Sequence, residues 1–358
     1  MLWFTRRQWL MQLQILGWMS LTMVIALRIG LLEQQNFYSN DQRYHTGLVN
    51  EVLTNGLPND LDWWLSLARV PYVIPATIIA ASGIESLLAL KFVSLLALLA
   101  TTSLIQREVL TTSIRDVVVT SYLSATAFIG VFFAALGLRE TMMMSLVLWF
   151  FASRSSAAKG SALLGLGLLR PHLAAALLIG SLVAFALHKL RHDSAASPLR
   201  NISYLATAPI LGYYVFSFGL QYQSGIGDVF GHTWGISPVL RIASNYVGLQ
   251  FLTVRESTVE LSITSLLLLR LLLSETIIIP LLLTTVVILT RRHTLLMQSV
   301  MWSFGIYVGI VTNTDFNSFR QNIPFMPVMG LVVLLAWQEH RERRSEVQTS
   351  PLTLQHET

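Results

Sequence analysis

Long apolar runs recur from the first residues of the chain almost to its end, and they constrain the fold more than any other feature. Several runs reach the roughly twenty residues that a helix needs to cross a hydrocarbon core, and 53% of the 358 residues are hydrophobic while only 12% are charged. No run alternates with the period of two that is typical of a membrane β-barrel. The sequence therefore predicts an all-α, polytopic transmembrane helix bundle.

The apolar runs predict about ten spans. We place them at 15–32, 86–105, 117–137, 141–153, 161–169, 171–188, 202–221, 274–290, 295–312 and 323–337. The halves 161–169 and 171–188 are short, so a broken or re-entrant pair is the alternative reading there. Prolines and a glycine between 70 and 83 predict a shallow helix that leads into the second full span.

Basic residues in the short loops give the predicted orientation. With the predicted spans, they all fall on one side of the membrane, at Arg6, Arg7, Arg107, Arg115, Arg154, Lys159, Lys189, Arg191, Arg200, Arg291, Arg292, Arg341, Arg343 and Arg344. The positive-inside rule assigns this side, and both termini, to the cytoplasm of a plasma (inner) membrane. Residues 1–338 then form one transmembrane domain, and 339–358 form a polar, disordered cytoplasmic tail.

The composition excludes several classes of function. The chain has no cysteine, so disulfide frameworks and thiolate chemistry are ruled out. Its net charge of +5 comes from loop arginines that set orientation, which gives no indication of nucleic-acid binding. The opposite, extracytoplasmic side receives the first outer loop, 33–69, with short amphipathic helices, and a large outer loop at 222–264.

The first outer loop holds a compact polar cluster in the segment Asn40-Asp41-Gln42-Arg43-Tyr44-His45. Asn40 and Asp41 form a helix-start signal, so Asp41 has a simple reading as a capping carboxylate. The other reading is a general base at the membrane surface that activates a hydroxyl or amide group of an acceptor substrate. Tyr44 and His45 lie one helical turn later and favour a site that also includes Arg43.

A tight turn, Gly137-Leu138-Arg139-Glu140, joins two apolar segments. It holds the Glu140 carboxylate at the hydrocarbon boundary, where charged groups usually face a cavity. An Arg139–Glu140 interfacial pair is the alternative.

Two further arginines lie where the predicted helices are broken. Arg170 stands between two short helical halves and precedes Pro171 and His172, and Arg320 precedes a proline-containing approach to the last span. An arginine in such a place needs an anion or carbonyl oxygens. A phosphate fits because guanidinium binds phosphate through two hydrogen bonds; a structural ion pair for Arg170 and an interfacial anchor for Arg320 are the alternatives.

The large outer loop offers His232 and Trp234 as candidate substrate-binding residues. An aromatic residue at this depth can equally belong to the interfacial aromatic belt. The histidines show no metal-ligand spacing, so the sequence predicts no metal ligands. No cofactor is assigned, although a divalent cation is compatible with the outer-face carboxylates.

These features together resemble the GT-C superfamily of glycosyltransferases, in particular the protein-mannosyltransferase and aminoarabinose-transferase branch. Asp41 matches the acid of the first outer loop, and Gln42 stands where many relatives have a second acid. The proline-containing segment 70–83, Glu140, Arg170 and the arginine-then-proline run from Arg320 match further features in order.

The resemblance implies a membrane glycosyltransferase of the cell envelope that moves a sugar from a polyprenyl-phosphate donor to a glycan, lipid or protein acceptor. Catalytic roles then fall to Asp41 and Glu140, and donor-phosphate binding to Arg139, Arg170 and Arg320. Arg43, Tyr44, His45, His172, His232 and Trp234 are the candidate substrate-binding residues. Alternatives are a polysaccharide polymerase or ligase that uses a lipid-diphosphate donor, and a non-enzymatic transporter of lipid or solute.

Overall fold

The described part of the chain is helical. A computed structural model describes residues 40–65, 69–110, 136–190, 198–224, 295–313 and 322–349, together with residue 242 and scattered residues within 9–20 and 122–134. Within these ranges no β-strand occurs. The prediction of an all-α chain is therefore confirmed for this portion.

The helices follow one another along the sequence with short connections. They are α2 (Asn40–Asn55), α3 (Leu61–Leu65), the π-helix η1 (Arg69–Val73), α4 (Ile74–Ala80), α5 (Ser86–Leu110), α7 (Glu140–Ala152), α8 (Ser156–Leu169), α9 (Pro171–Leu190), α10 (Pro198–Ser224), α14 (Leu295–Asn313), the 3-10 turn η5 (Ile323–Phe325) and α15 (Met326–Thr349).

Three of the described helices are long and apolar enough to cross a bilayer. They cover Ser86–Glu108, Pro171–Leu190 and Leu295–Thr312. Shorter apolar helices accompany them at Val70–Ala80, Glu140–Ala152, Ser156–Leu169 and Ile323–Glu339. The chain is thus a helical membrane protein, and the count of about ten spans stays a prediction.

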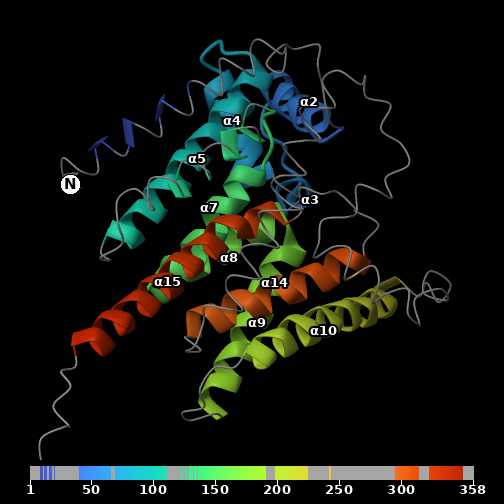
Figure 1. Ribbon diagram of the computed structural model, residues 1–358. Helices are drawn as coiled ribbons and strands as arrows, with labels where there is room; N and C mark the ends of the chain where they lie inside the picture. The colour runs from blue at the N-terminus through green and yellow to red at the C-terminus, as the bar shows by residue number, and fades with distance from the viewer. Residues whose placement is uncertain are drawn as a thin grey trace, which may run out of the picture.

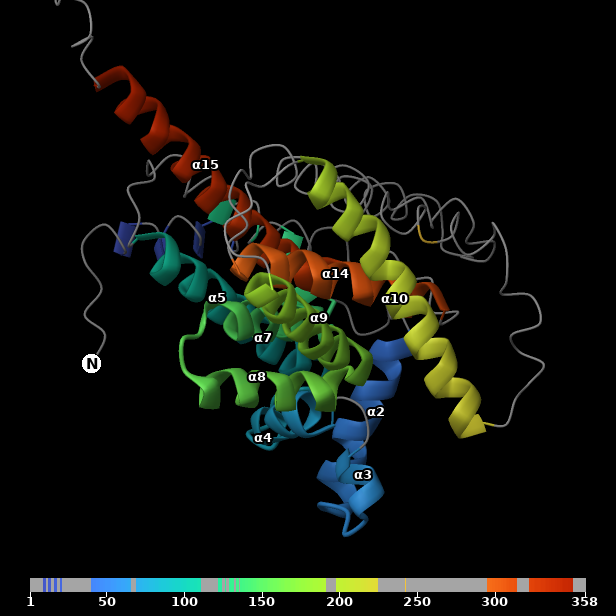
Figure 2. The same cartoon turned by 90° about the horizontal axis from the view of Figure 1, so that it is seen from below.

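Helices α9, α14 and α10 pack closely, with α14 in contact with both of the others, and they lie side by side in Figures 1 and 2. Glycines permit this approach. A Cβ atom added at Gly180 would overlap Ser303, and one at Gly309 would overlap the carbonyl oxygen of Pro209. Membrane helices commonly associate through small residues, which let their backbones approach closely.

The predicted first outer loop forms a small helical layer at the start of α5. Helices α2 and α4 contact each other and α5, and they lie together at the upper end of the molecule in Figure 1. Helix α2 begins at Asn40, so Asn40 and Asp41 lie within its first turn rather than before it, and it ends before Gly56, whose φ of 80° suits a helix terminus. The predicted helix at 70–83 is present as η1 and α4.

Two helix ends differ from the sequence-based expectation. Helix α8 starts at Ser156 rather than 161. Helix α15 continues through Glu339 to Thr349, so the prediction of a disordered tail is wrong for this stretch. Its polar residues are mostly Glu, Arg and Gln, which are good helix formers and extend an existing helix at little cost.

Candidate functional site

The turn before α7 is held in place by side chains from two other helices. The Nε2 atom of Gln42, in α2, donates a hydrogen bond to the carbonyl oxygen of Leu136. The Oγ atom of Ser94, in α5, donates to the carbonyl oxygen of Leu138 at 2.9 Å. Gly137 has a φ of 64°, and a Cβ atom there would lie 3.2 Å from the Lys91 side chain. The turn therefore has a fixed position relative to both helices.

A second set of contacts links this turn to the outer layer. The hydroxyl groups of Tyr72, in η1, and Ser94 are 2.9 Å apart. The His45 ring meets the Tyr72 ring edge-on, with centroids 5.4 Å apart. His45 and Tyr72 are both buried. The predicted substrate-binding residue His45 thus belongs to a buried network that ends one residue before Arg139.

Arg139 and Glu140 stand at the start of α7. The Nη1 atom of Arg139 donates a hydrogen bond to the carbonyl oxygen of Leu169 at 3.1 Å, which brings this guanidinium to the end of α8. The Glu140 side chain is fully buried. It lies in the first turn of α7, where the partial positive charge of a helix N-terminus favours a carboxylate. The prediction that Glu140 is held at a fixed, inward-facing position is consistent with this burial.

Arg170 interrupts the helix between α8 and α9. Its backbone is extended, with φ −159° and ψ 90°, while Leu169 ends one helix and Pro171 begins the next. The predicted broken pair at 161–188 is therefore two helices that meet at this residue. The Arg170 side chain is buried, and its Nη1 atom donates a hydrogen bond to the Tyr307 hydroxyl, in α14, at 2.9 Å.

His172 completes a group of side chains at this junction. Its ring stacks on the Tyr307 ring at 5.9 Å between centroids, with 9° between the planes. Arg139 joins this junction through its hydrogen bond to the carbonyl oxygen of Leu169, the residue before Arg170. We call Arg139, Arg170, His172 and Tyr307 the guanidinium cluster. Two guanidiniums beside a buried hydroxyl form an arrangement suited to binding an oxyanion.

The guanidinium cluster also borders the start of the last helix. The Tyr307 ring packs against Phe325, in η5, at 5.4 Å between centroids, and η5 also contacts α7. Residues 314–321, which include the predicted phosphate ligand Arg320, precede this turn and lie outside the described residues. The start of the last helix is irregular, as predicted: Pro324 lies in a 3-10 turn that precedes α15, and Pro327 lies in the first turn of α15.

The remaining predicted site residues divide into two groups. Arg43 and Tyr44 are exposed on α2, so they lie on a different face from the buried His45. Asp41 is the second residue of α2, but its side chain lies outside the described residues. His232 and Trp234 also lie outside them. The structure thus brings Arg139, Arg170 and His172 together, and it leaves the predicted roles of the others as predictions.

Sequence analysis missed Tyr307, the residue that contacts both Arg170 and His172. A signal for it was present, because a tyrosine in the middle of an apolar span needs a partner for its hydroxyl group. In the described ranges, no group of three or more His, Asp or Glu side chains could hold a metal ion.

No family model, curated protein or solved structure matches this chain.

Proposed function

We propose that this membrane protein is a glycosyltransferase that moves a sugar from a polyprenyl-phosphate donor to an extracytoplasmic glycan, lipid or protein acceptor. The observation that carries the proposal is the guanidinium cluster at the junction of α7, α8, α9 and α14. Arg139 reaches the carbonyl oxygen of Leu169, the residue before Arg170, and Arg170 and His172 both contact Tyr307.

Burial makes this cluster costly unless anionic or polar groups surround it. A cation inside a membrane protein is unfavourable without an anion or polar partners. The Tyr307 hydroxyl and the Leu169 carbonyl are among the polar partners of the two guanidiniums. A phosphate group can take up further donors from both arginines at once, which a carbonyl oxygen cannot do.

In the proposed reaction, the phosphate of the donor binds Arg139 and Arg170, with Arg320 as a further proposed ligand. The Asp41 carboxylate takes the proton of the acceptor hydroxyl while its oxygen forms a bond to the anomeric carbon. The bond from that carbon to the phosphate oxygen breaks, and the polyprenyl phosphate leaves with the electron pair. The guanidiniums stabilise the negative charge that develops on the leaving phosphate.

The proposal is tested with purified protein in liposomes and a panel of polyprenyl-phosphate-linked hexoses and pentoses. Arg170→Gln and Arg139→Gln should each lower transfer by on the order of a hundredfold, because each removes a donor to the developing charge. Arg154→Gln is the matched control, since Arg154 is exposed in the connection between α7 and α8. Full transfer by both cluster variants would refute the phosphate-binding role.

The same cluster is compatible with a related activity. Two neighbouring guanidiniums can bind a diphosphate as well as a monophosphate, and a lipid diphosphate is the donor of a polysaccharide polymerase or ligase. Supplying lipid-monophosphate sugars and lipid-diphosphate oligosaccharides side by side separates the two activities. Turnover of the diphosphate donor alone would assign the chain to the second class.

A further inference from the structure

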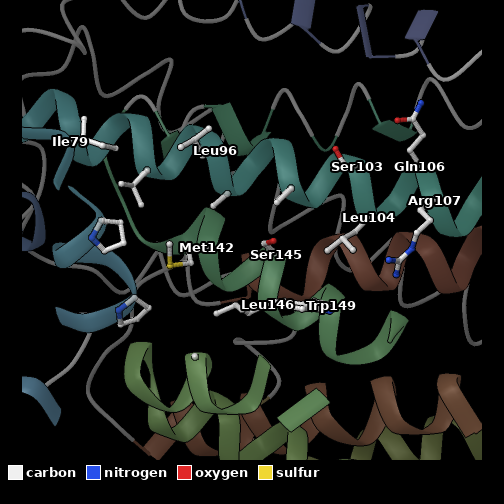
Figure 3. A pocket seen from close by; sticks show the side chains of 16 residues that line it. Ile79, Leu96, Ser103, Leu104, Gln106, Arg107, Met142, Ser145, Leu146 and Trp149 are labelled. Atoms are coloured by element: carbon white, nitrogen blue, oxygen red, sulfur yellow. The ribbon is translucent and has the colours of Figure 1, made fainter. Parts of the chain in front are cut away.

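An open apolar groove runs along α5. None of the residues of the guanidinium cluster lines it. It has a volume of about 800 Å³, within the roughly 300–1,000 Å³ that is typical of ligand sites. Its walls come from η1, α4, α5, α7 and α8, as Figure 3 shows for most of them. The lining is mainly apolar, and its members on α5 extend from Val93 to Arg107.

Small side chains hollow out the groove. Ala97, Ala100, Ser145 and Gly165 all line it, and they leave space that larger residues would fill. From Val93 to Arg107 the helix rises about 21 Å, at about 1.5 Å per residue. This length exceeds the ~15 Å that one leaflet of a ~30 Å hydrocarbon core spans. A single lipid tail can therefore lie along the groove.

Ser103, Gln106 and Arg107, three of the polar residues that line the groove, lie at one end of it. Figure 3 shows Ser103, Gln106 and Arg107 together, with Ile79 and Met142 toward the other end. Gln106 is buried and accepts a hydrogen bond from Gln12. Arg107 is the charged residue of the lining, and its side chain is 54% exposed.

The same end of the bundle is basic. Arg154 and Lys159 are exposed around the connection between α7 and α8, shortly after the groove residue Trp149. Glu108 binds Arg107 at 2.9 Å and offsets part of this charge. Such an exposed ion pair is weak, so a phosphate can compete with Glu108 for the guanidinium.

We propose that this groove binds one tail of an anionic phospholipid, with the lipid phosphate at Arg107. The charge of the Arg107 end identifies the headgroup class, because basic residues next to a membrane span attract anionic lipids. The apolar lining along α5 holds the tail. Trp149 also lines the groove and is 37% exposed, and tryptophan is a residue that favours the bilayer interface.

Protection of a single thiol tests the occupant directly. The chain has no cysteine, so Ala100→Cys introduces one thiol in the groove of the full-length protein. In detergent, phosphatidylglycerol should slow its alkylation by N-ethylmaleimide, and phosphatidylcholine with the same tails should do so much less. Ala186→Cys is the control, because Ala186 is exposed on α9 and does not line the groove.

The headgroup contact is tested by adding a second substitution. Arg107→Gln should raise the phosphatidylglycerol concentration needed for protection by roughly fivefold, the equivalent of ~1 kcal/mol for one basic residue at an anionic lipid. Lys189→Gln, at an exposed position of α9, should leave that concentration unchanged. The proposal does not depend on the glycosyltransferase activity, and protection is measured without any sugar donor.

Three results would overturn the proposal. Equal protection by both phospholipids would remove the role of the anionic headgroup. Absence of protection by either lipid would show that no phospholipid tail occupies the groove. Stronger protection by a polyprenyl phosphate than by phosphatidylglycerol would assign the groove to that lipid instead.

Discussion

The Nη1 atom of Arg170 donates a hydrogen bond to the hydroxyl oxygen of Tyr307 at 2.9 Å, although the two residues are 137 positions apart. The contact joins the break between α8 and α9 to the middle of α14. Tyr307 also stacks on His172, so one ring positions two of the residues that we assign to phosphate and substrate binding.

Tyr307→Phe should separate the hydrogen bond from the ring stacking. The variant keeps the stacked ring but removes the oxygen that accepts from a buried guanidinium. We expect a loss of about 1–2 kcal/mol in stability, seen as a lower melting temperature in detergent. Ser161→Ala is the control, because the Ser161 hydroxyl is exposed and bonds within its own helix. Equal melting temperatures for Tyr307→Phe and the wild type would mean that the contact contributes nothing to stability.

Gly309→Ala should weaken the contact between α14 and α10. Its added Cβ atom would overlap the carbonyl oxygen of Pro209, which is backbone and cannot rotate away. Overpacking of this kind costs about 1–3 kcal/mol.

Gly160→Ala is the matched comparison for that experiment. Nothing lies within 4 Å of the position that its Cβ atom would take in α8, so the higher helix propensity of alanine should stabilise this variant by about 0.5–1 kcal/mol. Melting temperatures that move in the same direction for the two variants would contradict the close approach of α10 and α14.

Ser94→Ala should loosen the turn that carries Arg139 and Glu140. The change removes the donor to the Leu138 carbonyl and the partner of the Tyr72 hydroxyl. Two buried polar groups would lose a hydrogen bond, at a cost of about 1–3 kcal/mol for each group left unsatisfied. Differential scanning fluorimetry measures the loss. Thr54→Ala, at an exposed position of α2, should leave the melting temperature nearly unchanged, and an equal drop in both variants would argue against a specific role for Ser94.

Asp41→Asn should abolish sugar transfer while leaving the fold intact. Asp41 is the second residue of α2, where losing its charge costs only about 0.3–1 kcal/mol of interaction with the helix dipole, so α2 should still form, but the amide cannot accept the acceptor's proton. We expect transfer to fall by about 100-fold or more if this residue is the general base. Assays in liposomes, with circular dichroism as the check on folding, measure both effects. Retention of full activity would remove Asp41 from the mechanism.

Local features of the fold could be predicted from the sequence. A helix start close to Asn40-Asp41 followed from these residues, and the break at Arg170 followed from the proline after it and from two short apolar halves. Both signals act within a few residues, where backbone preferences and capping decide the structure. The length of α15 was missed because polar composition was read as disorder, although its charged residues favour a helix.

The partners of the site residues could not be predicted in the same way. For Arg139 the sequence suggested phosphate binding or an interfacial pair with Glu140, and it gave no indication of the hydrogen bond to the Leu169 carbonyl. Arg170 was given an ion pair or a lipid phosphate, and it contacts Tyr307. Such contacts depend on how α7, α9 and α14 pack together, which hydrophobic periodicity within one helix does not specify.

The bond from Arg139 to the end of α8 has a consequence for ligand affinity. Free arginine side chains lose about 2 kcal/mol of rotamer freedom when an anion immobilises them. Here the neighbouring carbonyl and phenol already restrict both arginines, so much of that entropic cost is met during folding. An incoming oxyanion would meet donors that are already in position. Even a singly charged anion could then bind the two guanidiniums without a large rearrangement of their side chains.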